Sequence, residues 1–170
     1  MKNIESSTSK FREENGVIYF SVTSDGKTGE EWIEYFAKKG YRVGDYVLRS
    51  KDFKPTAGIT TEVAVLKGVL FEDKNRITKN IRAEAAKRKL LTPNAEVACL
   101  IRDKFTNEEL KAMDLYCIVT MHDPINDSGV GPLLLHVHRS GDGSWLNADF
   151  GEPGSQWGRD NGFAFVVSQV

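Results

Sequence analysis

The chain has 170 residues, of which 40% are hydrophobic and 28% charged, and its formal net charge is −1. This length and composition are typical of one globular domain, and the small charge excludes a global electrostatic attraction to nucleic acid or to an anionic membrane. The polar, serine-rich start from Met1 to Lys10 lacks the apolar core of a signal peptide. No run approaches the roughly 20 apolar residues of a membrane span. We therefore expect a cytoplasmic protein.

The first part of the chain predicts a flexible tail over residues 1–14, followed by a strand over 17–23, where apolar and polar residues alternate. Thr28 and Glu31 have the spacing of a capping box and predict the start of a helix over about 29–39. The β-branched run from 59 to 66 predicts a second strand.

The middle of the chain predicts helices. Residues 75–89 place apolar side chains at positions i, i+4 and i+8, and Thr92-Pro93 is a helix-start signal. Thr106 and Glu109 repeat the capping-box spacing and predict a short helix that ends near Met113.

The last third of the chain predicts four short strands, over residues 116–122, 133–138, 144–150 and 163–167. The glycines of Ser140-Gly-Asp-Gly143 favour a tight hairpin between the second and third of these strands. The last run is almost wholly apolar, which is typical of a central strand.

These elements predict a single α+β domain over residues 15–170. We expect a largely antiparallel sheet, built from a C-terminal four-strand meander and an N-terminal strand, with three to four helices on one side. The two cysteines, Cys99 and Cys117, fall within a predicted helix and a predicted strand, so we expect reduced core thiols rather than a disulfide.

Strand periodicity collects polar side chains on one face of the second and third C-terminal strands. His136 and His138 share this face, and Trp145 and Asp149 share the corresponding face of the next strand. Together with Trp157 from the loop 151–162, these five residues are the predicted ligand-binding set, because tryptophan beside Asp, Asn or Gln is suited to binding sugars, planar rings or cations. The loop 123–131 is also long enough to contribute to a site. The alternative for Trp157 is a lid over the domain's own core.

A metal site is an alternative use of the same face. Two histidines at i and i+2 on a strand project to one side about 7 Å apart, and Asp149 or His122 would supply a third ligand. With Asp149 as an acid–base group, such a site would belong to a metal-assisted hydrolase. A solvated polar face without metal is the competing interpretation. A Cys117–His122 dyad is disfavoured, because residues five apart lie on opposite faces of a regular strand.

A basic helix offers a nucleic-acid alternative. Lys79, Arg82 and Lys87 lie opposite the predicted apolar stripe of the helix 75–89 and would contact a phosphate backbone. A solvated helix surface explains the same charges, and the helix lacks aromatic residues for base stacking.

Three stretches resemble a family of small uncharacterised bacterial proteins: Thr92-Pro-Asn-Ala-Glu-Val-Ala-Cys-Leu-Ile-Arg102, Met121-His-Asp-Pro-Ile125 and Gly162-Phe-Ala-Phe165. The resemblance covers most of the chain and implies a bacterial cytoplasmic protein of one continuous domain. The family has no known activity, so the resemblance transfers no catalytic residue.

The sequence as a whole favours a non-enzymatic binding module whose site is the polar sheet face and the two C-terminal loops. As an alternative to ligand binding, the same face would be buried against a second copy of the chain in a homodimer, because an exposed indole and leucine are costly to leave in water. The hydrolase and the nucleic-acid binder are the alternatives.

Overall fold

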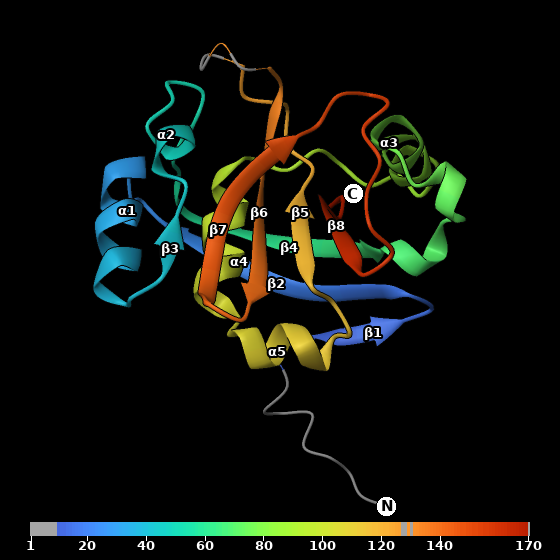
Figure 1. The fold of residues 1–170 in the computed structure, drawn as a ribbon, viewed down its shortest axis with the longest axis horizontal. Helices are drawn as coiled ribbons and strands as arrows, with labels where there is room; N and C mark the ends of the chain where they lie inside the picture. Colours follow the sequence, from blue (N-terminus) through green and yellow to red (C-terminus); the bar gives the residue numbers. More distant parts are fainter. Residues whose placement is uncertain (1–9, 127–128, 130, 170) are drawn as a thin grey trace, which may run out of the picture.

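The computed structural model describes residues 10–126, 129 and 131–169. Within these residues, eight strands form one mixed sheet and five α-helices pack against it (Figure 1). The strands are β1 (Arg12–Glu14), β2 (Val17–Asp25), β3 (Arg42–Val43), β4 (Ala57–Lys67), β5 (Cys117–Thr120), β6 (Leu133–Ser140), β7 (Gly143–Phe150) and β8 (Asn161–Val166). The helices are α1 (Gly29–Lys38), α2 (Asp45–Leu48), α3 (Thr78–Lys87), α4 (Glu96–Lys104) and α5 (Asn107–Ala112). No helix in this described part has the length and apolar character needed to cross a membrane.

The local signals of the sequence set several element boundaries. Both predicted capping boxes are confirmed: the hydroxyls of Thr28 and Thr106 accept the backbone N–H three residues on, at the starts of α1 and α5. The helix start predicted at Thr92-Pro93 is too early in the chain, because α4 begins at Glu96. Pro93 is instead buried in the segment that leads into the helix.

The N-terminal boundary also differs from the prediction. Arg12–Glu14 form strand β1, which pairs antiparallel with β2, so the predicted tail over residues 1–14 is wrong for this segment. Residues 1–9 lie outside the described residues. The sequence of β1 is charged and shows no apolar alternation, because it is an exposed edge strand held mainly by its hairpin partner.

The sheet has the order β1-β2-β4-β8-β5-β6-β7-β3. The β8–β5 and β3–β7 pairs are parallel and the other pairs are antiparallel, so the sheet is mixed. The predicted four-strand meander is wrong: β6 and β7 form the expected hairpin, with Gly143 at φ +141°, but β8 lies between β4 and β5. The physical reason is burial, because Phe163, Ala164 and Phe165 are covered on both sheet faces, whereas a strand beside β7 would lie near the edge.

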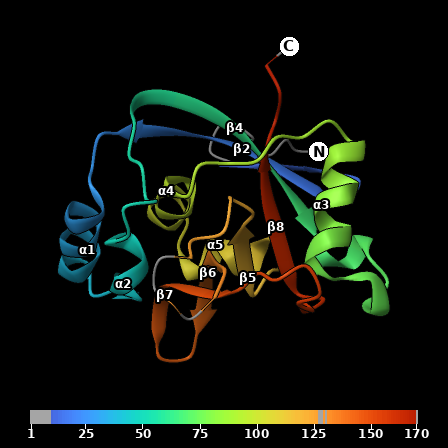
Figure 2. The ribbon, with the colours of Figure 1, turned by 90° about the horizontal axis from the view of Figure 1, so that it is seen from above.

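The sheet curls around α4, which Figure 2 shows between β2 and β4 on one side and β5–β7 on the other. This concave face holds the larger apolar core, to which α1, α2, α4 and α5 all contribute. A second core lies on the opposite face, where Ile81 and Ala85 of α3 pack with Phe163 and Trp157. The prediction that the helices cover one side is therefore wrong for α3.

Only part of the outer face is covered by this second core. The helix α3 and the loop 151–160 lie over β4 and β8, while the outer face of β6 and β7 carries half-buried or exposed polar residues. Leu134, predicted to lie on the polar face, is fully buried because the loop after β7 closes over it at Gly151. The polar face therefore begins where this cover ends.

The open part of the outer face is supported from below by an unusual buried residue. Arg102 of α4 is fully buried and donates to the backbone carbonyls of His138, Trp145 and Phe105 at 2.8–3.2 Å. Its guanidinium also lies over the ring of Tyr41, 5.4 Å from the ring centre. Burial lowers the pKa of Arg102. Through these contacts α4 fixes the β6–β7 hairpin at His138 and Trp145, two of the residues of the polar face.

Candidate functional site

A pocket of about 180 Å³ opens on the outer sheet face where β5 and β6 meet the loop 151–160. Its lining consists of Tyr116, Cys117, His136, His138, Asp149, Trp157 and Asn161. Four of the five predicted ligand-binding residues therefore meet at one place, and the fifth, Trp145, packs on His138 just outside the lining. We refer to this site as the sheet-face pocket.

The two histidines of the pocket contact each other. The Nδ1 atoms of His136 and His138 are 3.3 Å apart, a hydrogen bond in which one ring donates and the other accepts. The ring centres are 5.1 Å apart and the ring planes are inclined by 36°. Among the described residues, neither ring has another hydrogen-bond partner, so the Nε2 atom of each remains available.

The surroundings of the pair keep both rings neutral. Burial, assisted by the neighbouring His138 and opposed by Asp149, lowers the pKa of His136 to about 4. Burial also lowers the pKa of His138, and the charge of Arg102 beneath the sheet adds to this decrease. At neutral pH the pocket therefore presents one Nε2–H donor and one Nε2 acceptor.

A ladder of stacked rings holds His138 in place. Trp145 stacks on one side of the imidazole with ring centres 5.6 Å apart and planes inclined by 10°, and Tyr116 stacks on the other side at 5.6 Å and 27°. Arg42 of β3 then covers Trp145, 5.6 Å from the indole centre. Because these ring faces contact one another, the ladder presents ring edges to solvent and is suited to polar contacts rather than to base or sugar stacking.

Trp157 closes the pocket from the other side and is a fixed wall. Its indole N–H donates to the Thr78 hydroxyl at 2.9 Å, its ring meets Phe163 edge-on, and the side chain is 8% exposed. The backbone of Trp157 is also tied to Arg76 by two hydrogen bonds. Trp157 thus packs in the domain core, as the lid interpretation expects, and its side chain also lines the pocket.

The sequence reasoning missed Tyr116, Cys117 and Asn161 as lining residues. Cys117 lies directly opposite His138 in the β5–β6 pair, and burial raises the pKa of its thiol well above the ordinary value. Testing Cys117 only against His122 overlooked this cross-strand neighbour. An antiparallel pairing of the runs 116–122 and 133–138 brings the two residues together, but the register of that pairing comes only from the tertiary structure.

The structure also decides what the third histidine does. His122 follows β5 and is almost fully buried; its Nε2 accepts the backbone N–H of Leu135 at 2.9 Å, and its Nδ1–H donates to the Asp123 carbonyl at 2.7 Å. Burial lowers its pKa to about 4. Both nitrogens of His122 bond to backbone groups near the end of β5. His122 is therefore not available as a third metal ligand beside His136 and His138.

Among the described residues there is no group of three or more histidine, cysteine, aspartate or glutamate side chains placed to hold a metal ion. The carboxylate of Asp149, the other predicted third ligand, accepts the backbone N–H of Phe150 and is exposed. The metal site of the hydrolase alternative therefore has no third protein ligand among the described residues.

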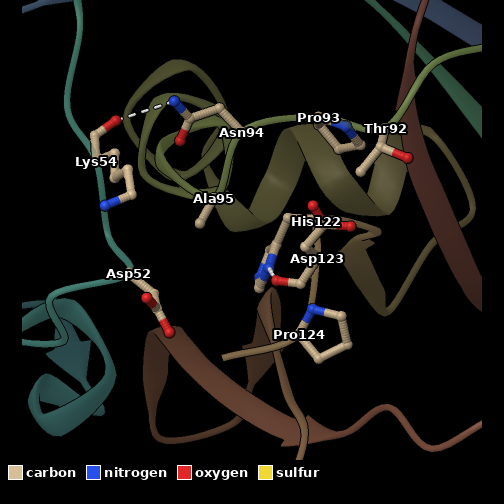
Figure 3. Close-up of a pocket in the computed structure, with 9 residues that line it drawn as sticks. All are labelled: Asp52, Lys54, Thr92, Pro93, Asn94, Ala95, His122, Asp123 and Pro124. Atoms are coloured by element: carbon tan, nitrogen blue, oxygen red, sulfur yellow. Dashed lines mark hydrogen bonds between the residues drawn. The ribbon is translucent and has the colours of Figure 1, made fainter. Parts of the chain in front are cut away.

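A larger cavity, of about 600 Å³, lies at the end of the sheet where β5 stops (Figure 3). Asp52 and Lys54 approach it from one side, residues 92–95 from the segment before α4, and residues 122–124 from the end of β5. This places the first residues of the predicted loop 123–131 in a cavity wall, while 127, 128 and 130 lie outside the described residues. The charged side chains, Asp52, Lys54 and Asp123, are exposed at its rim.

The three basic residues predicted to form one face of α3 do not all face solvent. Arg82 points inward and donates to the carbonyls of Met121 and His122, each at 2.9 Å, whereas Lys79 and Lys87 are exposed. The expectation that Arg82 belongs to a free basic face is therefore wrong. The reason is that its carbonyl acceptors sit at the end of β5, which the helix sequence alone does not reveal.

No known protein family, no curated protein and no solved structure matches the chain. The resemblance to uncharacterised bacterial proteins stays a prediction.

Proposed function

We propose that this protein is a binding module that takes a small polar ligand, or one polar group of a larger ligand, in the sheet-face pocket. The observation that carries the proposal is the His136–His138 pair. Its two neutral rings are held by stacking and by each other, and their Nε2 atoms have no partner among the described residues. Half-buried polar edges without partners are costly unless a ligand or solvent satisfies them.

The size of the pocket supports a small ligand. A volume of about 180 Å³ is below the roughly 300–1,000 Å³ of sites that enclose drug-sized molecules. The end cavity has the larger volume, yet its buried histidine has both nitrogens engaged and its charged groups lie at the rim. Unused hydrogen-bonding capacity, rather than volume, therefore favours the sheet-face pocket.

The proposal is tested with tag-free, chelator-treated protein and a panel of nucleotides, sugars, amino acids and small carboxylic acids. The measurement is the set of imidazole signals in a ¹H–¹⁵N spectrum, which separates the three histidines of the chain. We expect at least one compound to shift His136 and His138 and to leave His122 unchanged. His138→Ala and Asp149→Ala should weaken that binding, whereas Lys87→Ala on the exposed side of α3 should not.

Two results would overturn the proposal. One is a panel in which no compound moves the signals of the pair. The other is a binding compound whose affinity is the same in wild type, His138→Ala and Asp149→Ala. At Trp157 the suitable substitution is phenylalanine rather than alanine. Phenylalanine keeps an aromatic wall, whereas removal of the buried indole would disturb the core.

A further inference from the structure

We propose that His136 and His138 form a two-imidazole site for a borderline divalent transition-metal ion, with Cu²⁺, Ni²⁺ and Zn²⁺ as the metals of choice. This inference deepens the proposed function and rests on it, since the ion occupies the same sheet-face pocket. It differs from the hydrolase alternative, because it requires neither Asp149 nor His122 as a ligand.

The separation of the two Nδ1 atoms fits one shared ion. In a tetrahedral site with metal–nitrogen bonds of about 2.0–2.1 Å, two ligand nitrogens lie about 3.3–3.4 Å apart. The Nδ1 atoms of His136 and His138 are 3.3 Å apart. An ion therefore replaces the proton that the two rings share, after a small rotation that brings both lone pairs to a common apex. The displaced proton moves to Nε2 of the same ring, so both ligands remain neutral imidazoles.

The ring of His138 is positioned before any ion binds. Stacking between Tyr116 and Trp145 fixes the plane of His138, and Arg102 fixes the backbone of His138 and Trp145 from beneath the sheet. A site whose ligands are already ordered loses less conformational entropy on binding. The strand geometry adds to this order, because residues at i and i+2 leave the sheet on the same side.

The pair leaves open coordination positions. Because the described residues supply no third protein ligand, an ion held by two nitrogens would complete its coordination with water or with an anionic group of the bound molecule. Both histidines line the sheet-face pocket together with Trp157, so this pocket would hold that molecule. The ion would thus act as the anchor for a carboxylate or phosphate group, which deepens the proposed binding function.

The ligand chemistry predicts which ions bind. Imidazole nitrogen suits copper, nickel and zinc, and affinity at a site of this kind follows the order Ni²⁺ < Cu²⁺ > Zn²⁺. Hard cations such as Mg²⁺ and Ca²⁺ require oxygen ligands. Selectivity between these two groups of ions is therefore a property of the pair itself.

The experiment titrates tag-free, chelator-treated protein with each metal ion alone by isothermal calorimetry. We expect one ion per chain with Cu²⁺ bound most tightly, and no heat of binding with Mg²⁺ or Ca²⁺. His136→Ala and His138→Ala should each weaken Cu²⁺ binding by about tenfold or more, because each removes one ligand nitrogen and the loss of an outer-shell partner alone costs about 10–100-fold. Lys87→Ala is the control, because this exposed side chain on α3 lies outside the sheet-face pocket and its loss should leave Cu²⁺ binding unchanged.

A second measurement needs no variant. Titration of wild type with diamagnetic Zn²⁺ should move the Nδ1 signals of His136 and His138 together, while the signals of His122 stay in place. Affinity that is equal in both alanine variants and wild type, or Zn²⁺-dependent shifts at His122 alone, would overturn the site.

The two proposals fail in different ways. If no transition metal binds but a compound of the panel shifts the pair in chelator-treated protein, the metal inference is wrong and the binding function holds. If metal binds as expected while no compound binds with or without it, the metal site stands and the binding function is wrong.

Discussion

The chain contains three histidines, and the fold uses them in two different ways. His122, at the end of β5, has both nitrogens bonded to backbone groups and is almost fully buried. His136 and His138, on the outer face of β6, are bonded only to each other among the described residues. Burial lowers the pKa of all three side chains. A lowered histidine pKa therefore does not by itself identify a functional residue in this protein.

What separates the two regions is the use of hydrogen-bonding capacity. His122 accepts the Leu135 N–H in place of a backbone carbonyl where the β5–β6 ladder ends. This hydrogen bond therefore stabilises the fold. The pair has unused hydrogen-bonding capacity, and the stacked rings and Arg102 hold His138 in place. The comparison predicts large stability effects at His122 and large binding effects at the pair.

The largest expected effect is on stability at His122. His122→Ala leaves the Leu135 N–H without its acceptor and opens a cavity, so we expect a loss of about 3–4 kcal/mol in the free energy of unfolding. His136→Ala, at a half-buried position without backbone partners, should cost about 1 kcal/mol or less. Urea unfolding at pH 7 measures both. Equal losses in the two variants would remove the distinction between the regions.

The second effect is the dependence of stability on pH. The folded-state pKa of His122 is about 4, below the roughly 6.5 of an unfolded chain. Between these values the unfolded state binds more protons, so stability falls as the pH falls. One such group contributes a loss of about 2 kcal/mol between pH 7 and pH 5. The double variant His136→Ala/His138→Ala is the suitable protein, because His122 is then its only histidine. Unfolding free energies that do not differ between pH 7 and pH 5 would contradict this reading of His122.

The third effect is at the ring ladder. Trp145→Ala removes the stacked partner of His138, which we expect to cost about 1 kcal/mol. It also exposes the imidazole to solvent, so the pKa of His138 should rise toward its ordinary value because burial is the first cause of its decrease. An NMR titration of His138 checks this, with Trp145→Phe as the variant that keeps a ring in place. A pKa of His138 that is the same in both variants would show that the ladder does not shield the imidazole.

The smallest effect is expected on α3, which belongs to neither region. Lys79→Glu and Lys87→Glu change exposed side chains, so the free energy of unfolding should stay within about 0.5 kcal/mol of wild type. Metal and ligand binding at the sheet-face pocket should not change. Fluorescence anisotropy with labelled single-stranded RNA tests the nucleic-acid alternative in the same variants. RNA binding by wild type that the two reversals abolish would make α3 a binding surface and add a second function.

Local signals in the sequence determined many of the elements. The capping boxes at Thr28 and Thr106 were predicted correctly, because a cap involves only neighbours in the chain. The hairpin of β6 and β7 was also predicted correctly, since its turn residues and alternation are local. Periodicity further placed His136, His138 and Trp145 on one face, which the structure confirms through their mutual ring contacts.

Only the tertiary structure decided what lies next to these elements. The position of β8 between β4 and β5 could not be predicted from its own residues. An apolar run indicates that a strand is buried, but it does not indicate which strands lie on either side of it. The same limit hid Cys117 and Tyr116 beside His138 and turned Arg82 inward toward the end of β5. Periodicity fixes the side of the sheet on which a side chain lies, whereas its partners depend on pairings between distant segments, which arise only when the whole chain is packed.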